Sequence, residues 1–285
     1  MRDFKKIIVI PLVMIFFCSN LFLVYLLKDK KIDKEPIKPK IVLISHIKTN
    51  PYWLSIKAGA ERAAKERGAV VEFLGPTTAS TEDGLKLFDM ATSAKVSGII
   101  TYVQEEGKYT KNINNAVEKG IPVVTIDSDE ENSNRMAYVG TNNVLAGQAA
   151  GEETIRQIGE NGNIAIVMGG KDAKNQKERV EGFKNYITSN SNLKIVDTDS
   201  SDAMLLEAEI ATRKILNRNE KIDALFCTSA FDGIGAAKAV NDLNYKGKVK
   251  IICFDDLEDT LNDIKNGLVA ATIVQKSNEM GYRAV

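Results

Sequence analysis

Polar and aromatic residues follow several short apolar runs of this sequence, and they are the residues that could do chemistry. Asn50, Tyr52 and Trp53 follow the first run, Asp127 ends the fourth, and Asp255 follows the eighth. Carboxylate and amide groups are thus combined with two flat rings. The set contains no evident pair of a nucleophile and a base, so ligand binding is a better expectation than turnover.

A sugar suits this mixture of groups, because its hydroxyls donate and accept hydrogen bonds and its C–H faces pack on aromatic rings. One hydrogen bond to a charged group contributes about 1.5–3 kcal/mol. Micromolar affinity needs only about −8 kcal/mol, so several such bonds and two rings are sufficient after the cost of association. The other candidates at the ends of apolar runs are Asn175, Lys177, Ser229 and Gln275.

Simpler structural explanations of these residues stay open. An Asp after a strand often caps the next helix, and Asp255 could do no more than that before a helix near Leu257. Tyr52 and Trp53 could belong to the core. Gly169-Gly170 could cradle a phosphate, but the sequence contains no G-x-G-x-x-G and no G-x-x-x-x-G-K-[ST].

We expect no metal, no cofactor and no enzymatic activity. The one histidine, His46, has no Cys, His or carboxylate at a metal-binding spacing, and G-x-S-x-G, C-x-x-C and H-E-x-x-H are absent from the sequence. Cys227 and Cys253 lie in apolar runs, which favours buried single thiols and leaves a disulfide open. The 38 basic and 38 acidic residues cancel, which argues against nucleic-acid binding.

The elements that must position these groups alternate along the chain. Apolar runs rich in Ile and Val predict parallel strands buried on both faces. Amphipathic stretches between them predict helices; one carries Trp53, Ile56 and Ala60 on a single face and is closed by Gly68. The expected strands are 40–45, 70–74, 98–103, 122–127, 163–168, 193–198, 223–228, 249–254 and 269–274.

The alternation breaks once, at 128–157, and we interpret this stretch as the crossing between two similar α/β lobes. Lobe 1 is expected at 40–141 together with 276–285, and lobe 2 at 142–275. In open parallel sheets, ligands bind outside the carboxyl ends of the strands. The candidate residues are therefore expected around one gap between the lobes.

The N-terminal segment is expected to be a membrane anchor at 1–27 followed by a charged tether at 28–39. Ile7 to Leu27 carries no charge, and as a helix it would span about 30 Å. The alternatives are a cleaved signal peptide and a lipoprotein acylated at Cys18. No small-x-small site follows the run, and bulky Phe16 and Phe17 precede Cys18. The excess of Lys after the run favours a cytoplasmic globular part, whereas the other observations favour the extracytoplasmic face.

With these residues in view, the sequence resembles the periplasmic sugar-binding proteins of the ribose- and galactose-binding type, the type 1 periplasmic binding proteins. The resemblance runs from about Lys38 to Val285. It implies two Rossmann-like lobes joined by a hinge, with a helix and a third interlobe strand beyond the position of Val285. The motifs that carry it are TNPYW, IPVVTIDSD, GTNNVLAGQAAGE, KERVEGF, IICFDD and AATIVQ.

The resemblance also implies roles for individual residues. Asn50 would bond ring-edge hydroxyls while Tyr52 and Trp53 cover a sugar face, and Asp127 would accept from two hydroxyls. The second-lobe Asp is matched by Asp255 and the hinge glutamine by Gln275. Lys177 stands where ribose binders carry an Arg, with Asn175 as a second candidate.

Three departures from the ribose-binding pattern argue for another pentose or a hexose. Ser128, Ser229 and Ala203 replace an Arg, an Asn and an aromatic residue, respectively. The function implied is an extracytoplasmic receptor that closes on a monosaccharide and serves an ABC importer. The alternative is a membrane-anchored sensory subunit beside a histidine kinase, as in xylose-binding members of this kind. The effector domain of LacI-type repressors shares the expected fold but needs a helix-turn-helix where this chain has its apolar run.

Overall fold

A computed structural model describes residues 14–23, 25, 38–218 and 221–285. The chain divides into two compact units, Met1–Lys38 and Pro39–Val285. In the first unit, residues 14–23 and 25 are helical. Within the described residues, no helix combines the length and apolar character needed to cross a bilayer. The expected anchor, 1–27, and tether, 28–39, lie largely outside the described residues.

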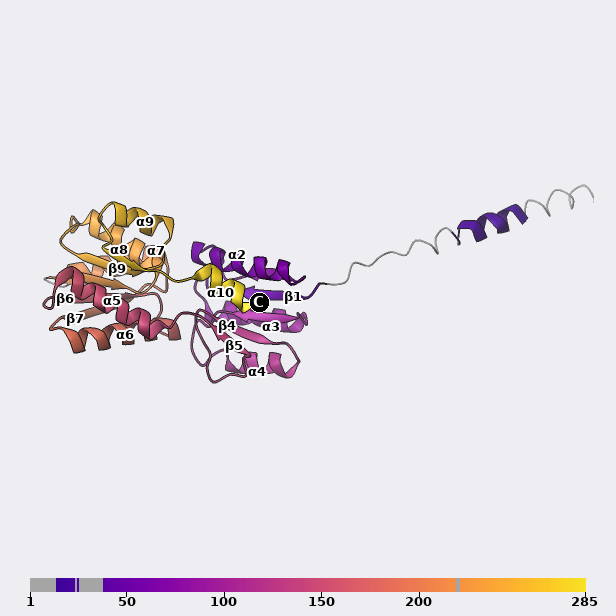
Figure 1. Ribbon diagram of the computed structural model, residues 1–285, viewed down its shortest axis with the longest axis horizontal. Helices are drawn as coiled ribbons and strands as arrows, with labels where there is room; N and C mark the ends of the chain where they lie inside the picture. Colours follow the sequence, from indigo (N-terminus) through magenta and orange to yellow (C-terminus); the bar gives the residue numbers. More distant parts are fainter. Residues whose placement is uncertain (1–13, 24, 26–37, 219–220) are drawn as a thin grey trace, which may run out of the picture. The chain divides into compact units, whose positions relative to one another are not determined.

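The second unit contains two parallel sheets (Figure 1). Among the described residues the first sheet has five strands in the order β2-β1-β3-β4-β5. Its strands are β1 (Lys40–Ile44), β2 (Val70–Leu74), β3 (Gly98–Thr101), β4 (Val123–Ile126) and β5 (Ala137–Val139). The direction of the strand order reverses between β1 and β3. Sheets of this kind commonly bind ligands at such a reversal.

The second sheet repeats this order, with β10-β9-β8-β6-β7 among the described residues. Its strands are β6 (Asn163–Met168), β7 (Lys194–Ser200), β8 (Ala224–Cys227), β9 (Lys250–Phe254) and β10 (Ala271–Ile273). The α/β class with two similar parallel sheets is therefore confirmed. The strand prediction missed β5, which has three partly exposed residues and lies inside the stretch we had interpreted as the crossing.

Helices cover both faces of each sheet, and we call each sheet with its helices a lobe. In lobe 1, Val42 and Ile44 of β1 pack with α3 (Thr81–Ser93) and α4 (Thr110–Glu118). Leu43 packs on the opposite face with α2 (Pro51–Glu66) and α10 (Ser277–Ala284). Adjacent strand residues thus enter different cores, which explains the unbroken apolar runs.

Lobe 2 is built in the same way. One core lies under α7 (Leu205–Arg218) and α8 (Ala230–Asp242), and the other under α5 (Asn143–Ile158) and α6 (Lys174–Asn190). The last helix of this lobe is α9 (Glu258–Lys265). Cys227 and Cys253 are buried free thiols in the first of these cores, as the apolar runs around them indicated.

Glycines allow close contact between two helix pairs, α5 with α6 and α2 with α10. A Cβ on Gly147 would lie 2.1 Å from the Arg179 carbonyl oxygen, and one on Gly182 would lie 2.0 Å from the Val144 carbonyl oxygen. The backbones are therefore too close for any larger side chain. This contact fixes α6, which carries several pocket residues, against the remainder of lobe 2.

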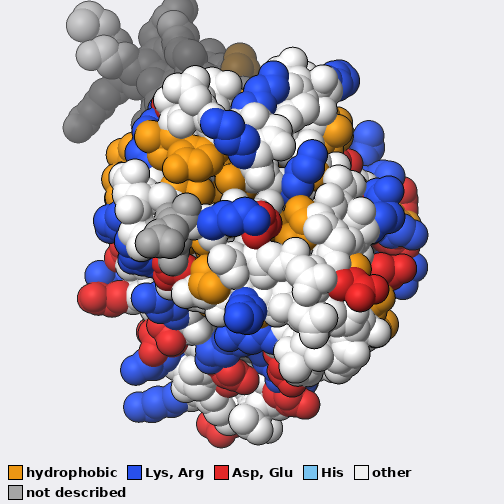
Figure 2. All heavy atoms as spheres, turned by 90° about the vertical axis from the view of Figure 1, so that its left-hand side faces the viewer, with side chains coloured by type: hydrophobic (Ala, Val, Ile, Leu, Met, Phe, Trp, Pro, Cys, Tyr) orange, Lys and Arg blue, Asp and Glu red, His pale blue; other side chains and the backbone are white. Residues whose placement is uncertain are grey.

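Charged side chains of both signs are interspersed on the face shown in Figure 2. This agrees with the balance of 38 basic and 38 acidic residues in the sequence. No large field of one sign covers this face, so it offers no electrostatic footprint for a polyanion.

Candidate functional site

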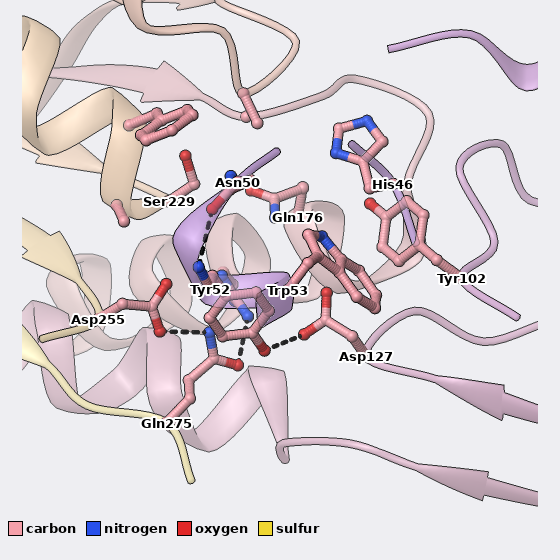
Figure 3. Close-up of a pocket in the computed structure, with 15 residues that line it drawn as sticks. His46, Asn50, Tyr52, Trp53, Tyr102, Asp127, Gln176, Ser229, Asp255 and Gln275 are labelled. Atoms are coloured by element: carbon pink, nitrogen blue, oxygen red, sulfur yellow. Dashed lines mark hydrogen bonds between the residues drawn. The ribbon is translucent and has the colours of Figure 1, made fainter. Parts of the chain in front are cut away.

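A pocket lies at the carboxyl ends of the strands, and residues of both lobes line it (Figure 3). The loops after β1, β3, β4, β6, β8 and β9 contribute to its wall, together with the N-terminal turns of α2, α6 and α8. The lining residues are His46, Asn50, Tyr52, Trp53, Tyr102, Asp127, Gly169, Gln176, Arg179, Ala203, Ser229, Ala230, Phe231, Asp255 and Gln275.

The N-terminus of α2 provides an amide and two rings. Asn50 is the N-cap, and its Oδ1 accepts from the Tyr52 N–H at 3.0 Å, while Pro51 starts the helix. With its oxygen used for the cap, Asn50 offers its amide N–H groups to the pocket. Trp53 packs edge-on against Tyr52 and Tyr102, with centroids 5.8 and 5.4 Å apart. The core explanation of Tyr52 and Trp53 is correct, yet both side chains also line the pocket. Asp255 does not cap the next helix, because the N-cap of α9 is Leu257 and no side-chain hydrogen bond closes that end.

Asp127 enters the pocket from lobe 1 at the end of β4. The Tyr52 hydroxyl donates to its Oδ1 at 2.7 Å, and Asn175 Nδ2 of lobe 2 donates to its Oδ2 at 3.0 Å. Burial raises the pKa of the Asp127 carboxyl, while the Arg179 charge opposes this. The Tyr52 pKa is raised well above its ordinary value by burial, so this phenol is a donor to the carboxylate.

Asp255 enters from lobe 2, where Gln275 Nε2 donates to its Oδ1 at 2.9 Å. Gln275 Oε1 accepts from Arg179 Nη2 at 2.7 Å and from the Thr141 hydroxyl at 2.8 Å. Burial raises the pKa of Asp255 to about 7, against the opposing effect of the Arg179 charge. A hydrogen-bonded chain thus joins the two segments that cross between the lobes, 140–142 and 274–276.

Arg179 is the central cation of the site and is 2% exposed. Its Nε donates to Asn143 Oδ1 at 3.0 Å and its Nη1 to the Thr228 carbonyl oxygen at 2.7 Å. The guanidinium lies 4.2 Å from the centroid of the Phe254 ring. These contacts hold a positive charge near Asp127 and Asp255 without a direct ion pair to either of them among the described residues.

The structure brings most of the predicted site residues together. Asn50, Tyr52, Trp53, Asp127, Ser229, Asp255 and Gln275 all line the pocket. Ser229 also caps α8, because its hydroxyl accepts from the Asp232 N–H at 3.3 Å. Asn175 lies directly behind Asp127 and is buried.

Lys177 is not brought to the pocket. Its ammonium group lies 3.2 Å from Glu106 Oε2, and its side chain is 45% exposed. The arginine in the pocket is Arg179, two residues further along KERVEGF. The helix phase could have revealed this, because Gln176, Val180 and Phe183 fall on the buried face of α6 with Arg179.

Other pocket residues were also missed. His46 lies against Tyr102, with ring centroids 4.9 Å apart, and burial lowers the pKa of its imidazole to about 4. The ring is therefore neutral at physiological pH. Phe231, in the first turn of α8, lines the pocket from lobe 2, as does Ala203.

The arrangement can grip a neutral, polyhydroxylated molecule. Carboxylates accept hydrogen bonds from both sides, amides and a guanidinium donate them, and aromatic rings cover apolar faces. Across the described residues, no group of three or more His, Cys, Asp or Glu side chains could hold a metal ion.

Comparison with known proteins agrees with this architecture. Residues 41–285 match the family model described as "Periplasmic binding protein domain". A chain in the solved XylFII-LytSN complex is 86% identical, with a TM-score of 0.86, over 88% of this chain and 92% of the other. The D-allose-binding periplasmic protein of Escherichia coli is 27% identical over 242 residues, 82% of this chain and 78% of the relative. The ribose import binding protein RbsB of Haemophilus influenzae is 25% identical over 240 residues, 83% of this chain and 80% of the relative.

Two parallel α/β lobes around a polar and aromatic pocket are the architecture of a class of ligand-binding proteins. With the match over residues 41–285, this chain belongs to the periplasmic binding protein family. The family resemblance inferred from the sequence motifs is confirmed, and the relatives are binding proteins, not enzymes.

Proposed function

We propose that this protein binds a monosaccharide, a pentose or a hexose, in the pocket between its lobes. The observation that carries the proposal is the convergence of Asp127 and Asp255 from opposite lobes on one pocket that Trp53 and Tyr52 also line. Carboxylates from two sides can each accept from sugar hydroxyls, and rings cover the C–H face. Relatives named for D-allose and ribose support a sugar as the ligand class.

The same pocket supports a change of shape on binding. The carboxyl of Asp127 accepts from Asn175 of the other lobe, so closure and ligand binding use the same groups. A ligand that contacts both lobes binds the closed form better and shifts the population toward it.

For the biological role, we favour a sensory subunit that contacts a membrane histidine kinase. The support is the 86% identical chain found in a complex with a second protein, LytSN. Relatives named as import proteins are only 23% to 27% identical. Delivery to an ABC permease remains the second candidate, and these import relatives are the observation in its favour.

We further propose that the protein acts on the extracytoplasmic face of the cell membrane, held there by its N-terminal segment. The support is the charge-free run from Ile7 to Leu27, followed by a charged stretch. At about 1.5 Å per residue, a helix of this length matches the thickness of a bilayer.

Trp53 provides the test of ligand binding, because it is the only tryptophan and lines the pocket. The purified full chain is titrated with a panel of D-pentoses and D-hexoses while its fluorescence is recorded, and every sugar of the panel is also measured by calorimetry. A saturable change with at least one sugar is expected. If no sugar of the panel changes the fluorescence or releases heat, the proposed function is wrong.

Partner capture separates the two roles. The tagged chain is expressed in its native cell, solubilised with and without the sugar found in the titration, and the bound proteins are identified. Recovery of a histidine kinase supports the sensory role, whereas recovery of an ABC permease in its place supports import.

A further inference from the structure

Thr228 holds both polar side chains that α6 directs into the pocket. Its carbonyl oxygen accepts from Arg179 Nη1 at 2.7 Å, and its hydroxyl donates to Gln176 Oε1 at 2.5 Å. Gln176 and Arg179 are three residues apart and therefore share one helix face. Thr228 itself is fully buried at the end of β8 and does not line the pocket.

The contacts of the Thr228 hydroxyl set the orientation of the Gln176 amide. The Gly169 N–H donates to this hydroxyl at 2.9 Å. The 2.5 Å separation from Gln176 suits an O–H···O bond and is shorter than the usual N–H···O distance. The other acceptor nearby, Asp232 Oδ2, is 3.4 Å away. The amide oxygen of Gln176 therefore points to Thr228, and the amide nitrogen points away from it.

The Gln176 nitrogen is left as a free donor at the pocket wall. Within the described part of the chain it has no hydrogen-bond partner, although the side chain is only 5% exposed. Figure 3 shows Gln176 between Asn50 and His46, on the side of the pocket away from Gln275. A donor held in this way discriminates between ligands by whether they offer an acceptor at that point.

We propose that Gln176, oriented by the Thr228 hydroxyl, determines specificity by donating to one oxygen of the bound ligand, with Thr228 as its positioning residue. The inference rests on the proposed sugar-binding function and deepens it. Asp127 and Asp255 accept hydrogen bonds and so recognise the hydroxyl protons of the ligand. Gln176 recognises a lone pair, carried by either a hydroxyl or the ring oxygen.

The test combines variants of the protein with variants of the ligand. Gln176→Met keeps the length of the side chain and removes the donor. Affinities of the wild type and this variant are measured for the best sugar of the panel, its series of monodeoxy analogues and its carba analogue, in which CH2 replaces the ring oxygen. For the parent sugar, Gln176→Met is expected to weaken binding about 3- to 10-fold, the effect of one neutral hydrogen bond. For the one analogue that lacks the recognised oxygen, the two proteins are expected to bind equally.

Thr228 offers a matched pair of variants. Thr228→Val keeps the shape and the carbonyl oxygen that holds Arg179 but removes the hydroxyl, whereas Thr228→Ser keeps the hydroxyl. Thr228→Val is expected to reproduce the selectivity of Gln176→Met, and Thr228→Ser that of the wild type. If Thr228→Val does not fold, judged by its thermal unfolding, Gln176→Met and Thr228→Ser still decide the question.

Lys177→Met is the control, because Lys177 is on the same helix but points to Glu106 rather than the pocket. It is expected to leave the ranking of the analogues unchanged. The inference is overturned if Gln176→Met weakens the binding of every analogue by the same factor. It is also overturned if this variant binds the parent sugar as tightly as the wild type does. Failure of the wild type to bind any sugar overturns the proposed function instead.

Discussion

Asp127 and Asp255 occupy equivalent positions in the two lobes and have the same unusual backbone conformation. Each follows the fourth strand of its sheet, with φ of 65° and 69°. The N–H of each donates at 2.9 Å to the neighbouring edge strand, to the Val139 and Ile273 carbonyl oxygens. Asp tolerates this left-handed region better than most residues. The conformation turns the chain at the end of the strand, so that both carboxyls face the pocket.

The first prediction concerns the charge on Asp127. Asp127→Asn keeps the size of the side chain and also tolerates positive φ, so it removes the carboxylate without adding backbone strain. Loss of a charged acceptor is expected to weaken sugar binding by about 1.5–3 kcal/mol, or roughly 10- to 150-fold. Calorimetry measures the effect, and unchanged affinity would remove Asp127 from the site.

The second prediction concerns Arg179. Arg179→Lys keeps the charge, but a single ammonium cannot reproduce the bonds of the guanidinium to Asn143, Thr228 and Gln275. We expect loss of measurable sugar binding together with a lower unfolding midpoint, because partners buried beside it lose their donors. Lys184→Arg, at an exposed position of the same helix, is the control. If Arg179→Lys binds sugar with wild-type affinity, the several N–H donors of the guanidinium are not needed for binding.

The lobes and the family could be predicted from the sequence because their signals are strong and local. Unbroken Ile/Val runs report strands buried on both faces, and TNPYW and IICFDD fix the ends of two strands. β5 was missed because its three residues pair along one edge only and carry no apolar run. Its place is set by β4, which is a tertiary interaction that no local pattern reports.

The site residues divide in the same way. Groups that directly follow a strand, such as Asp127 and Asp255, were identified because the end of the strand fixes their place. Residues on α6 depend instead on the rotation of the helix. The resemblance pointed to Lys177, whereas in the structure Lys177 faces Glu106 and Arg179 lines the pocket. Gln176 and His46 could not be ranked from spacing, since their role depends on contacts with residues far away in sequence, Thr228 and Tyr102.

The third prediction assigns Lys177 to contact between the lobes. Lys177 pairs with Glu106 of lobe 1, and Lys174 pairs with Glu131 of the same lobe. Because these pairs are partly exposed, each contributes at most about 1 kcal/mol to the closed form. Lys177→Met is expected to weaken the affinity for all sugars by the same factor, below about fivefold, with an effect that shrinks at high salt.

A double-mutant cycle with Glu106→Gln checks this assignment. If the two residues act through their mutual contact, the second substitution lowers the sugar affinity little further once the first is present. Independent, additive losses would contradict a direct interaction between Lys177 and Glu106.

The fourth prediction concerns the contact between α5 and α6. Gly182→Ala would place a Cβ 2.0 Å from the Val144 carbonyl oxygen, so the helices must separate. We expect a lower thermal midpoint and weaker sugar binding together, because α6 carries both Gln176 and Arg179. Asn185→Ala, at an exposed position of the same helix, is the control and should be neutral or slightly stabilising. Full stability in Gly182→Ala would show that the backbone can adjust.

The fifth prediction concerns the pH dependence of stability. Burial lowers the pKa of His46 from 6.5 to about 4. Below pH 6.5 the unfolded chain therefore takes up a proton that the folded chain does not, so the contribution of His46 to stability falls as the pH decreases from about 6.5 to 4. Between pH 7 and pH 5 the expected loss is about 2 kcal/mol.

Buried acids, among them Asp232 and Asp255, act in the opposite direction in this window, so the effect of His46 must be isolated by substitution. Burial raises the pKa of Asp232 and of Asp255 to about 7; each therefore takes up its proton more readily in the folded chain and stabilises it as the pH falls from about 7 toward 4. Urea unfolding of the wild type and of His46→Gln at pH 7 and pH 5 separates the contributions. His46→Gln is expected to gain stability relative to the wild type on acidification, because it keeps the buried acids and lacks the histidine. Equal pH dependence in the two proteins would mean that the His46 ring takes up its proton as easily when folded as when unfolded.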